Sequence, residues 1–337
     1  MKELVLPCPD DFHVHLRQGT NLPLYTKDLA FQFGRALIMP NTVPPIDSAI
    51  AVQKYKAEIL NAASEVSKNF TPLMTFKLKP TYTKEDLIQM QLAGAIAAKY
   101  YPAGVTTNSA DGISDFEAVF PVLKMMEDSG IILCVHGEEP GAFCLDREFL
   151  FIERMKRLVQ EFPKLKIVFE HLSTAASVEF VKNAPENIAA TITVHHLLMT
   201  LDDIIGNALC PHHFCKPLPK LPKDKEALRE VVFSGNKKFF FGSDSAPHLK
   251  ENKECECGAA GVYSMLSALP LLATEFENAG ALDKLENFIC HFGRAFYGLK
   301  ENPGTITLVK ESWNVPDNVH GVVPLAAGKT LQWKVKV

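Results

Sequence analysis

The chain alternates short apolar runs with amphipathic stretches over most of its length, and this rhythm limits the folds that it can adopt. Runs rich in β-branched or aromatic residues occupy positions 4–8 with 12–16, 35–39, 72–78, 94–100, 131–135, 166–170, 188–194 and 238–242. Eight strand candidates that are apolar on both faces favour a parallel sheet covered by helices. We therefore predict a closed (β/α)8 barrel of the TIM type, since no GxGxxG phosphate turn supports an open, doubly wound sheet.

Helices are predicted between these runs, at residues 48–63, 83–93, 114–129, 148–162, 174–183 and 224–234. Ser114 and Glu117 have the spacing of a capping box, and Thr83 precedes two acidic residues in a first turn. After Gly242 the rhythm changes, and we expect extra C-terminal helices at 263–278 and 282–291. Short strands at 303–310 and 332–337 are expected to pack outside the barrel. Because no linker, repeat or low-complexity stretch appears, residues 1–337 are predicted to form a single domain.

Composition excludes several classes of protein. The 337 residues are 47% hydrophobic, enough for one large domain of this kind. The 35 basic and 39 acidic residues give a net charge of −4, and without a basic run they argue against nucleic-acid binding. No segment reaches the roughly 18 apolar residues of a membrane span, and the N-terminus lacks a signal peptide. Eight cysteines are then expected to be reduced thiols, in a cytoplasmic protein that binds no membrane.

Six polar residues fall at or just past the ends of predicted strands, where a parallel barrel would bring them to one rim. Singly, each such histidine is more often a satisfied rim residue than a ligand. His13 and His15 are two apart, so their side chains point to the same side of a strand. Four histidines from three strand ends favour a metal site. The six residues are His13, His15, Lys99, His136, His171 and Asp244.

Lys99 and Asp244 need further chemistry to belong to such a site. An ammonium group only donates hydrogen bonds, so Lys99 would become a ligand only if carbon dioxide carboxylated its nitrogen. Without that modification, a lysine in this position is more often a snorkelling or salt-bridged residue. Asp244 could be a turn residue. Beside a metal-bound water, whose pKa falls from about 15.7 toward 7, it would instead carry the proton.

The loops after His136 and His171 contain further polar residues. Glu138 and Glu139 follow the first histidine, and Ser173 and Thr174 follow the second. Partners that orient metal-binding histidines are usually found at such positions.

The cysteines offer a rival site. Cys210, His212, His213 and Cys215 lie close together in CPHHFC, and Cys255 and Cys257 form CEC. These residues could bind a structural zinc ion, but neither cluster has the usual CxxC spacing.

Seven segments resemble, in order and spacing, the amidohydrolase superfamily and within it the dihydroorotase family of the compact bacterial type. They run from the N-terminus to about Gly261 and are DDFHVHLRQG, MPNTVPP, KYYPAGVTTNSADGI, VHGE, FEHLST, FGSDSAPH and CGAAGVY. The resemblance implies a (β/α)8 barrel with two zinc ions and a carboxylated lysine. It also implies reversible cyclisation of N-carbamoyl-L-aspartate to L-dihydroorotate, in the biosynthesis of the pyrimidine UMP, by a homodimer.

The resemblance also assigns roles to individual positions. It implies that His13, His15 and Asp244 hold one zinc ion, and that His136 and His171 hold the other. A hydroxide and carboxylated Lys99 would bridge the pair. Asp244 would be the catalytic residue, moving a proton between the hydroxide and the ring nitrogen of the substrate.

Substrate contacts are implied in the same way. Arg17 can offer two parallel N–H groups to the α-carboxylate, and the resemblance adds Asn41 and His248. In the loop 102–112, two threonines would close over the bound ligand and exclude water. At Lys216 only a backbone contact can be transferred. The implied substrate-binding set is His15, Arg17, Asn41, Thr106, Thr107, His136, Lys216, His248 and Ala260.

Three alternatives stay open. A related cyclic amidase, such as a hydantoinase or allantoinase, would use the same metal centre with other carboxylate contacts; the TTNS and DSAPH segments favour the dihydroorotase reading. A non-catalytic homologue would typically have lost metal ligands, whereas all six are present. A barrel with an unrelated function would leave the alignment of these histidines at strand ends unexplained.

Overall fold

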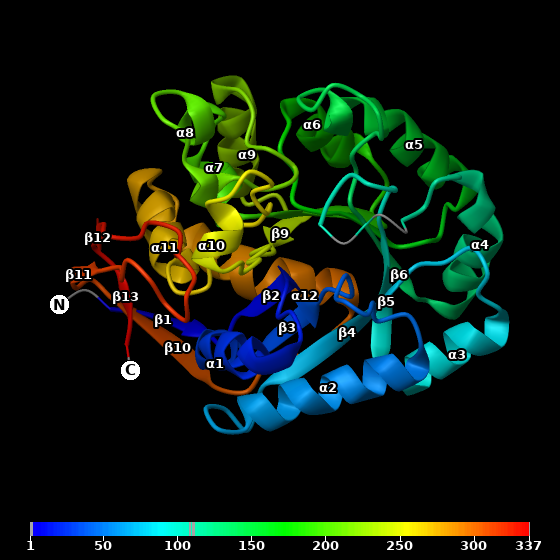
Figure 1. Ribbon diagram of the computed structural model, residues 1–337, viewed down its shortest axis with the longest axis horizontal. Helices are drawn as coiled ribbons and strands as arrows, with labels where there is room; N and C mark the ends of the chain where they lie inside the picture. Colours follow the sequence, from blue (N-terminus) through cyan, green and yellow to red (C-terminus); the bar gives the residue numbers. More distant parts are fainter. Residues whose placement is uncertain (1–2, 108, 110–111, 337) are drawn as a thin grey trace.

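The computed structural model describes residues 3–107, 109 and 112–336, and its centre is an eight-stranded parallel sheet. The strands follow one another in chain order and curl into a nearly closed barrel with helices around it (Figure 1), which confirms the predicted fold. The barrel strands are β2 (Asp10–Val14), β3 (Arg35–Ile38), β4 (Thr71–Lys77), β5 (Ala95–Tyr100), β6 (Ile132–Val135), β7 (Ile167–Phe169), β8 (Ile188–Ile192) and β9 (Phe239–Phe241).

The barrel closes through the segment that follows its last strand. Val14 and Ser245 form an isolated parallel bridge. The Asp244 backbone N–H donates to the His13 carbonyl oxygen over 2.8 Å, and the His15 N–H donates to that of Ser245 over 3.0 Å. The seam between the first and last strands therefore runs through three of the six candidate ligands.

Helices cover the outside of the barrel (Figure 1), because each turns a buried apolar face toward the sheet. In α2, for example, Val52, Tyr55 and Ile59 are buried at helical spacing, and the Ser48 side chain caps the first turn. The helices of at least nine residues are α1 (Leu22–Gln32), α2 (Ala49–Ala63), α3 (Lys84–Leu92), α4 (Phe120–Ser129), α5 (Arg147–Glu161), α6 (Ala175–Asn183), α9 (Pro222–Ser234) and α11 (Ala268–Asn278). Shorter helices are α7 (Val194–Leu198), α8 (Asp202–Ile205), α10 (Lys250–Lys253) and α12 (Phe292–Tyr297).

Several boundaries differ from the sequence-based expectation. The capping box expected at Ser114 does not form, because the Glu117 N–H donates to Asp115 and α4 begins only at Phe120. The box at Thr83 forms with Asp86. The expected strand 188–194 ends at Ile192, and α7 follows at once.

The C-terminal segments also deviate. The helix expected from residue 263 begins at Ala268, and residues 282–291 form a 3₁₀ turn and a π turn. The first apolar run divides between two sheets, since β1 (Glu3–Pro7) pairs antiparallel with β10 (Thr305–Val309) outside the barrel. The other outer strands are β11 (Trp313–Asn314), β12 (Thr330–Leu331) and β13 (Lys334–Val335).

One end of the barrel is filled by apolar side chains. A compact buried cluster includes Phe12, Leu37, Ala97, Val168 and Phe240. Helix α12 closes this end, where its Tyr297 ring stacks on that of Phe12 at a centroid distance of 4.8 Å. The interior is therefore left free for polar groups only toward the opposite end, where the strands finish. Within the described ranges, no helix has the length and apolarity needed to cross a bilayer.

This packing predicts a strong response at Gly293 in α12. A Cβ atom there would overlap the Phe12 ring and lie 2.9 Å from Phe240 Cδ2. We expect Gly293→Ala to lower the free energy of unfolding by about 1–3 kcal/mol, because a close-packed core does not absorb added volume. Ala295→Ser, at an exposed position of the same helix, should stay within about 0.5 kcal/mol of the parent. Equal urea midpoints for the parent and Gly293→Ala would contradict this account of the barrel floor.

Candidate metal centre and substrate pocket

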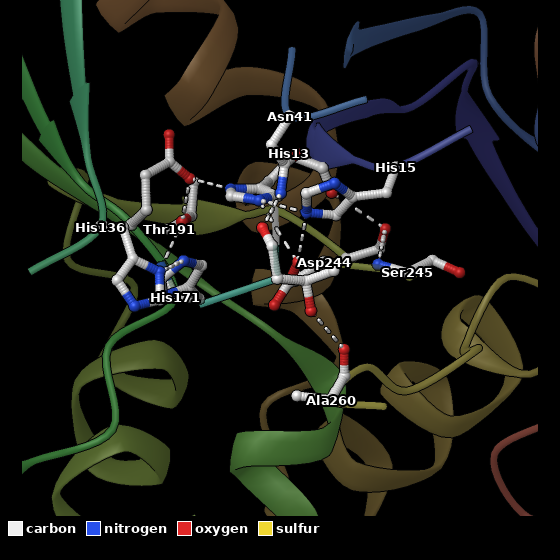
Figure 2. Close-up of polar contacts among 12 residues, drawn as sticks. His13, His15, Asn41, His136, His171, Thr191, Asp244, Ser245 and Ala260 are labelled. Carbon is white, nitrogen blue, oxygen red and sulfur yellow. Dashed lines mark hydrogen bonds and ion pairs between the residues drawn. The ribbon is translucent and has the colours of Figure 1, made fainter. Parts of the chain in front are cut away.

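Two histidines and an aspartate meet where the barrel closes (Figure 2). His13 lies in β2, His15 directly follows that strand, and Asp244 follows β9. The Nε2 atoms of the two histidines are 3.3 Å apart. Asp244 Oδ1 lies 3.3 Å from His13 Nε2 and 3.1 Å from His15 Nε2. All three side chains are buried, and their ligand atoms can reach a single cation.

A second pair of histidines lies beside this group. His136 follows β6, and His171 comes two residues after β7. His136 Nδ1 is 3.2 Å from His171 Nε2. The rings of His171 and His13 have centroids 5.0 Å apart, so the two groups are neighbours at the ends of the barrel strands (Figure 2).

These separations suit shared cations. Two ligands that each lie about 2.0–2.1 Å from one zinc ion, at a tetrahedral angle, are about 3.3 Å apart. Burial lowers the pKa of His15 to about 4 and the pKa of His171 well below its ordinary value, so these two imidazoles are neutral and keep a lone pair for a cation. Neutral nitrogens in contact at this distance gain little from one another, but a cation between them would be bound by both.

Carboxylates orient two of the histidines from behind. His13 Nδ1–H donates to Glu170 Oε2, which also accepts from the Thr191 hydroxyl over 2.9 Å. His136 Nε2 lies 2.8 Å from Glu138 Oε2. An N–H bound to a carboxylate fixes the tautomer and leaves the other ring nitrogen as the ligand.

The sequence anticipated only part of this outer layer. Glu138 contacts His136 as its position suggested, but Glu139 pairs with Arg154 instead. Ser173 and Thr174 donate to the buried Glu148 and not to a histidine. Glu170 was missed, although a glutamate at the end of an apolar run, directly before His171, is a signal that could have identified it.

Lys99 lies in β5 with no exposed surface. Its Nζ has no hydrogen-bond partner among the residues that the structure describes, and it lies 5.4 Å from the centre of the Tyr101 ring. Burial lowers the pKa of the Lys99 amine, and the nearby Glu170 carboxylate opposes this only in part. A buried amine without an acceptor is costly. Its neutral form can add carbon dioxide, so the residue suits a carboxylated, metal-bridging lysine.

Asp244 is held as a carboxylate in an unfavourable backbone conformation. Burial raises its pKa, but the charge and hydrogen bonding of His13 and the hydrogen bond of His15 outweigh burial and bring the pKa well below its ordinary value. Asp244 and His171 both have φ of +43°, and Arg17 has φ of +60°. Non-glycine residues in this region are strained, and such strain concentrates at functional sites.

A small cavity next to Asp244 collects most of the expected substrate contacts. Its free volume is about 20 Å³, which is room for roughly one water molecule. Its lining is His15, Arg17, Asn41, Thr106, Thr107, Cys215, Lys216, Asp244, Ala246, Ala260 and Gly261.

His248 stands behind this cavity and contacts its basic residue. Arg17 Nη2 lies 2.8 Å from His248 Nε2, and Arg17 Nε donates to the Pro247 carbonyl over 3.1 Å. Burial and the Arg17 charge lower the pKa of His248 to about 3, so its ring is neutral and can accept from the guanidinium. His248 Nε2 also lies 3.0 Å from the Ala260 carbonyl oxygen.

The loop with the two threonines lies against the pocket. The Thr107 hydroxyl donates to the Ala260 carbonyl over 3.2 Å, and Asn41 Nδ2 donates to the Thr107 carbonyl over 3.1 Å. The Thr106 N–H donates to Ser109 Oγ over 3.0 Å. Asn108, the third residue of the TTNS segment, lies outside the described residues. Thr106 and Thr107 therefore line the cavity beside Asn41 and Ala260.

The rival cysteine site is not assembled as the sequence suggested. His212 pairs with Glu254, and His213 Nδ1 lies 2.8 Å from the Asp203 carbonyl oxygen. Over the described ranges, Cys210, His212, His213 and Cys215 do not gather their ligand atoms around one point. Cys215 instead lies near His195 and His196.

Comparisons with known proteins agree with this geometry. The model of the amidohydrolase family matches residues 4–315. A curated protein named dihydroorotase from Teredinibacter turnerae is 46% identical over 340 residues, which cover 99% of this chain and 98% of the relative. The structure of dihydroorotase from Campylobacter jejuni superposes with a TM-score of 0.93 at 42% identity, covering 99% of this chain and 98% of that one.

A yeast structure is equally similar in shape. Dihydroorotase from Saccharomyces cerevisiae, solved in complex with 5-fluoroorotic acid, has a TM-score of 0.93 at 37% identity and covers 100% of this chain and 99% of its own. A family match over most of the chain, together with relatives this similar over their whole length, leaves no doubt about ancestry. The chain belongs to the amidohydrolase family, and within it groups with the dihydroorotases.

Proposed function

We propose that the chain is a metal-dependent dihydroorotase, which reversibly cyclises N-carbamoyl-L-aspartate to L-dihydroorotate with release of water. One observation carries the proposal: four histidines, Asp244 and a buried Lys99 that has no hydrogen-bond partner among the described residues lie together at one barrel rim, in a chain 46% identical over its length to proteins named dihydroorotase. The reaction class is that of a hydrolase acting on a cyclic amide.

The residues fit a pair of divalent cations. His13, His15 and Asp244 would hold one, and His136 and His171 would hold the other, with carboxylated Lys99 between them. The short ligand separations support this assignment, as does the Lys99 amine, which has no hydrogen-bond partner in the part of the chain that the structure describes. When bound, the cations supply Lewis acidity, polarising the carbonyl group and making water acidic near neutral pH.

Asp244 moves the proton. In ring opening, a C–O bond forms between water and the ring carbonyl carbon, and the C–N bond breaks. The low pKa of Asp244 keeps it ionised, so its carboxylate can take the proton of the attacking water and deliver it to the departing nitrogen. Ring closure runs in reverse, with Asp244 accepting the proton of the carbamoyl nitrogen.

The small pocket beside Asp244 would recognise the substrate carboxylate. Arg17 offers a charged fork, neutral His248 can donate or accept, and Asn41 offers an amide. The yeast relative was solved with 5-fluoroorotic acid, an acidic pyrimidine of comparable size, which supports a ligand of this class. His15, His136, Lys216 and Ala260 are further proposed contacts. Thr106 and Thr107 would exclude water while the ligand is bound.

The relatives favour this activity over a hydantoinase or allantoinase, which would share the metal centre. The finer expectations are part of the same proposal: zinc as the metal, two ions per subunit, a homodimer, a cytoplasmic location and a role in pyrimidine biosynthesis.

Replacing Asp244 tests the function and its main catalytic residue together. We expect the parent to hydrolyse dihydroorotate, and Asp244→Asn to lose about 10²–10⁴-fold in kcat, because a general acid–base group contributes that much. Asp202→Asn, an exposed control in α8, should keep parental rates. Hydrolysis of hydantoin but not of dihydroorotate by the parent would contradict the proposal.

Glu170 tests the orientation of the ligands. Glu170→Gln should weaken metal binding about 10- to 100-fold, since a carboxylate behind a ligating histidine sets its tautomer and basicity. Competition with a chelator, followed by metal analysis, measures this affinity. Glu139→Gln is the matched control, because Glu139 pairs with Arg154 rather than with a histidine. Equal affinities for the two variants would refute the role given to Glu170.

The threonine loop is tested by a double substitution. Thr106→Ala with Thr107→Ala removes two hydroxyl groups, each proposed to donate to the ligand a hydrogen bond of about 0.5–1.5 kcal/mol, so kcat should fall roughly 5- to 150-fold. Metal content should not change, because neither threonine is among the proposed metal ligands. Thr305→Ala, exposed in β10, serves as the control. Near-parental turnover in the double variant would show that the loop does not act as a lid.

A further inference from the structure

A second group of metal-binding side chains lies outside the centre described above. His195 and His196 belong to α7, which follows β8, and Cys215 lies in the segment that lines the substrate cavity. Each residue offers one ligand atom, and these atoms lie within 4.8 Å of one another. All three residues are buried, so this is not a chance gathering of surface groups.

His195 is the member that calls for an explanation. Its side chain has no exposed surface, and neither ring nitrogen has a hydrogen-bond partner among the described residues. Buried polar atoms are nearly always bonded, and an exception often marks the place of an ion or water. Burial lowers the pKa of His195 to about 4, so the ring is neutral and keeps a lone pair for a cation.

His196 is already oriented as a ligand would be. Its Nε2 lies 3.0 Å from the Pro217 carbonyl oxygen, and its Nδ1 lies 2.8 Å from the Thr193 hydroxyl. An imidazole that donates one N–H to a carbonyl presents the other nitrogen as an acceptor. A cation at Nδ1 would replace the hydrogen bond to the Thr193 hydroxyl, whose oxygen also accepts from the His196 backbone N–H as the N-cap of α7.

Cys215 gives the group its chemical preference. Its Sγ–H makes only a weak bond, of 3.4 Å, to the Pro217 carbonyl oxygen. Two imidazoles and one thiolate select borderline or soft cations such as Zn²⁺ and Cd²⁺ over Mg²⁺ and Ca²⁺. The catalytic centre described above contains no sulfur, so the two sites differ in kind.

We propose that His195, His196 and Cys215 form a third cation site, which takes a thiophilic divalent metal and inhibits the enzyme when filled. Cys215 lines the same cavity as Lys216 and Asp244, so a metal bound to its sulfur changes the wall of the substrate pocket. Binding at this site stands on its own geometry; only the inhibition rests on the proposed function.

Coordination breaks the S–H bond, forms a sulfur–metal bond and releases the proton to solvent. Burial raises the pKa of the Cys215 thiol, so apparent affinity rises with pH. The charged and titratable groups acting on Cys215 and His195 are Asp244 and Glu138, which favour a cation, and Lys253, Lys220, His213 and His13, which oppose it when protonated.

Cadmium tests the site in the zinc-loaded enzyme. Equilibrium dialysis gives the metal bound per chain, and the ultraviolet charge-transfer band of cadmium thiolate reports sulfur ligation only. We expect the parent to bind one cadmium with this band and to lose activity in step with it. His195→Gln should keep its activity without cadmium, and its cadmium affinity at this site should fall at least tenfold.

The exposed thiols need their own control. Cys255 and Cys257 have Sγ atoms 3.8 Å apart and could bind cadmium themselves. Cys255→Ser with Cys257→Ser should retain the band and the inhibition that belong to the buried site. Loss of the band in this variant and its persistence in His195→Gln would overturn the proposal.

A further variant guards against misfolding of His195→Gln. Cys215→Ser removes the sulfur ligand itself. A cadmium–thiolate band of unchanged intensity in this variant would also overturn the proposal. A parent protein that binds no cadmium through sulfur would overturn it as well. These readouts do not need turnover. A parent that binds cadmium through Cys215 but never hydrolyses dihydroorotate would contradict the proposed function and leave the site intact.

Discussion

A lysine amine buried without an acceptor is the constraint on which the rest of the site depends. Lys99 has no exposed surface, and its Nζ lacks a hydrogen-bond partner among the described residues. A charged ammonium in this position would cost several kcal/mol. The proposed carboxylation would resolve the conflict, because it would replace the donor with an anion that can share cations with the nearby histidines. On this proposal the histidines, the aspartate and the lysine would satisfy one another as a metal-bound unit.

The barrel makes this unit possible by holding its members rigidly. Parallel strands bring side chains from distant segments to one rim, and the apolar cluster around Phe12 and Phe240 fixes the strands from below. Glu170 and Glu138 orient two imidazoles. The left-handed backbone at His171 and Asp244 stores strain that the surrounding packing must compensate. The fold therefore gives up some stability in order to hold the ligand atoms of the site in place.

The sequence predicted the features that depend on the alternation of apolar runs or on the position of a residue at a strand end. The alternating runs predicted the barrel, and the strand-end positions of His13, His136 and His171 predicted that they would lie together. The sequence did not predict the strand pairings and side-chain partners that depend on tertiary contacts. The first apolar run divides between two sheets because β1 finds β10 some 300 residues later in the chain, and no local pattern encodes that pairing. Glu170 and His195 were missed, and Cys215 was grouped with the wrong histidines, because their partners are set by the fold.

The most direct test of the central claim is anomalous diffraction at the zinc edge from crystals of the metal-loaded protein. Two peaks are predicted, one among His13, His15 and Asp244 and one between His136 and His171, with electron density extending from Lys99 Nζ as a carboxylate that meets both. A bare Lys99 amine, or metal peaks that avoid these histidines, would contradict the account.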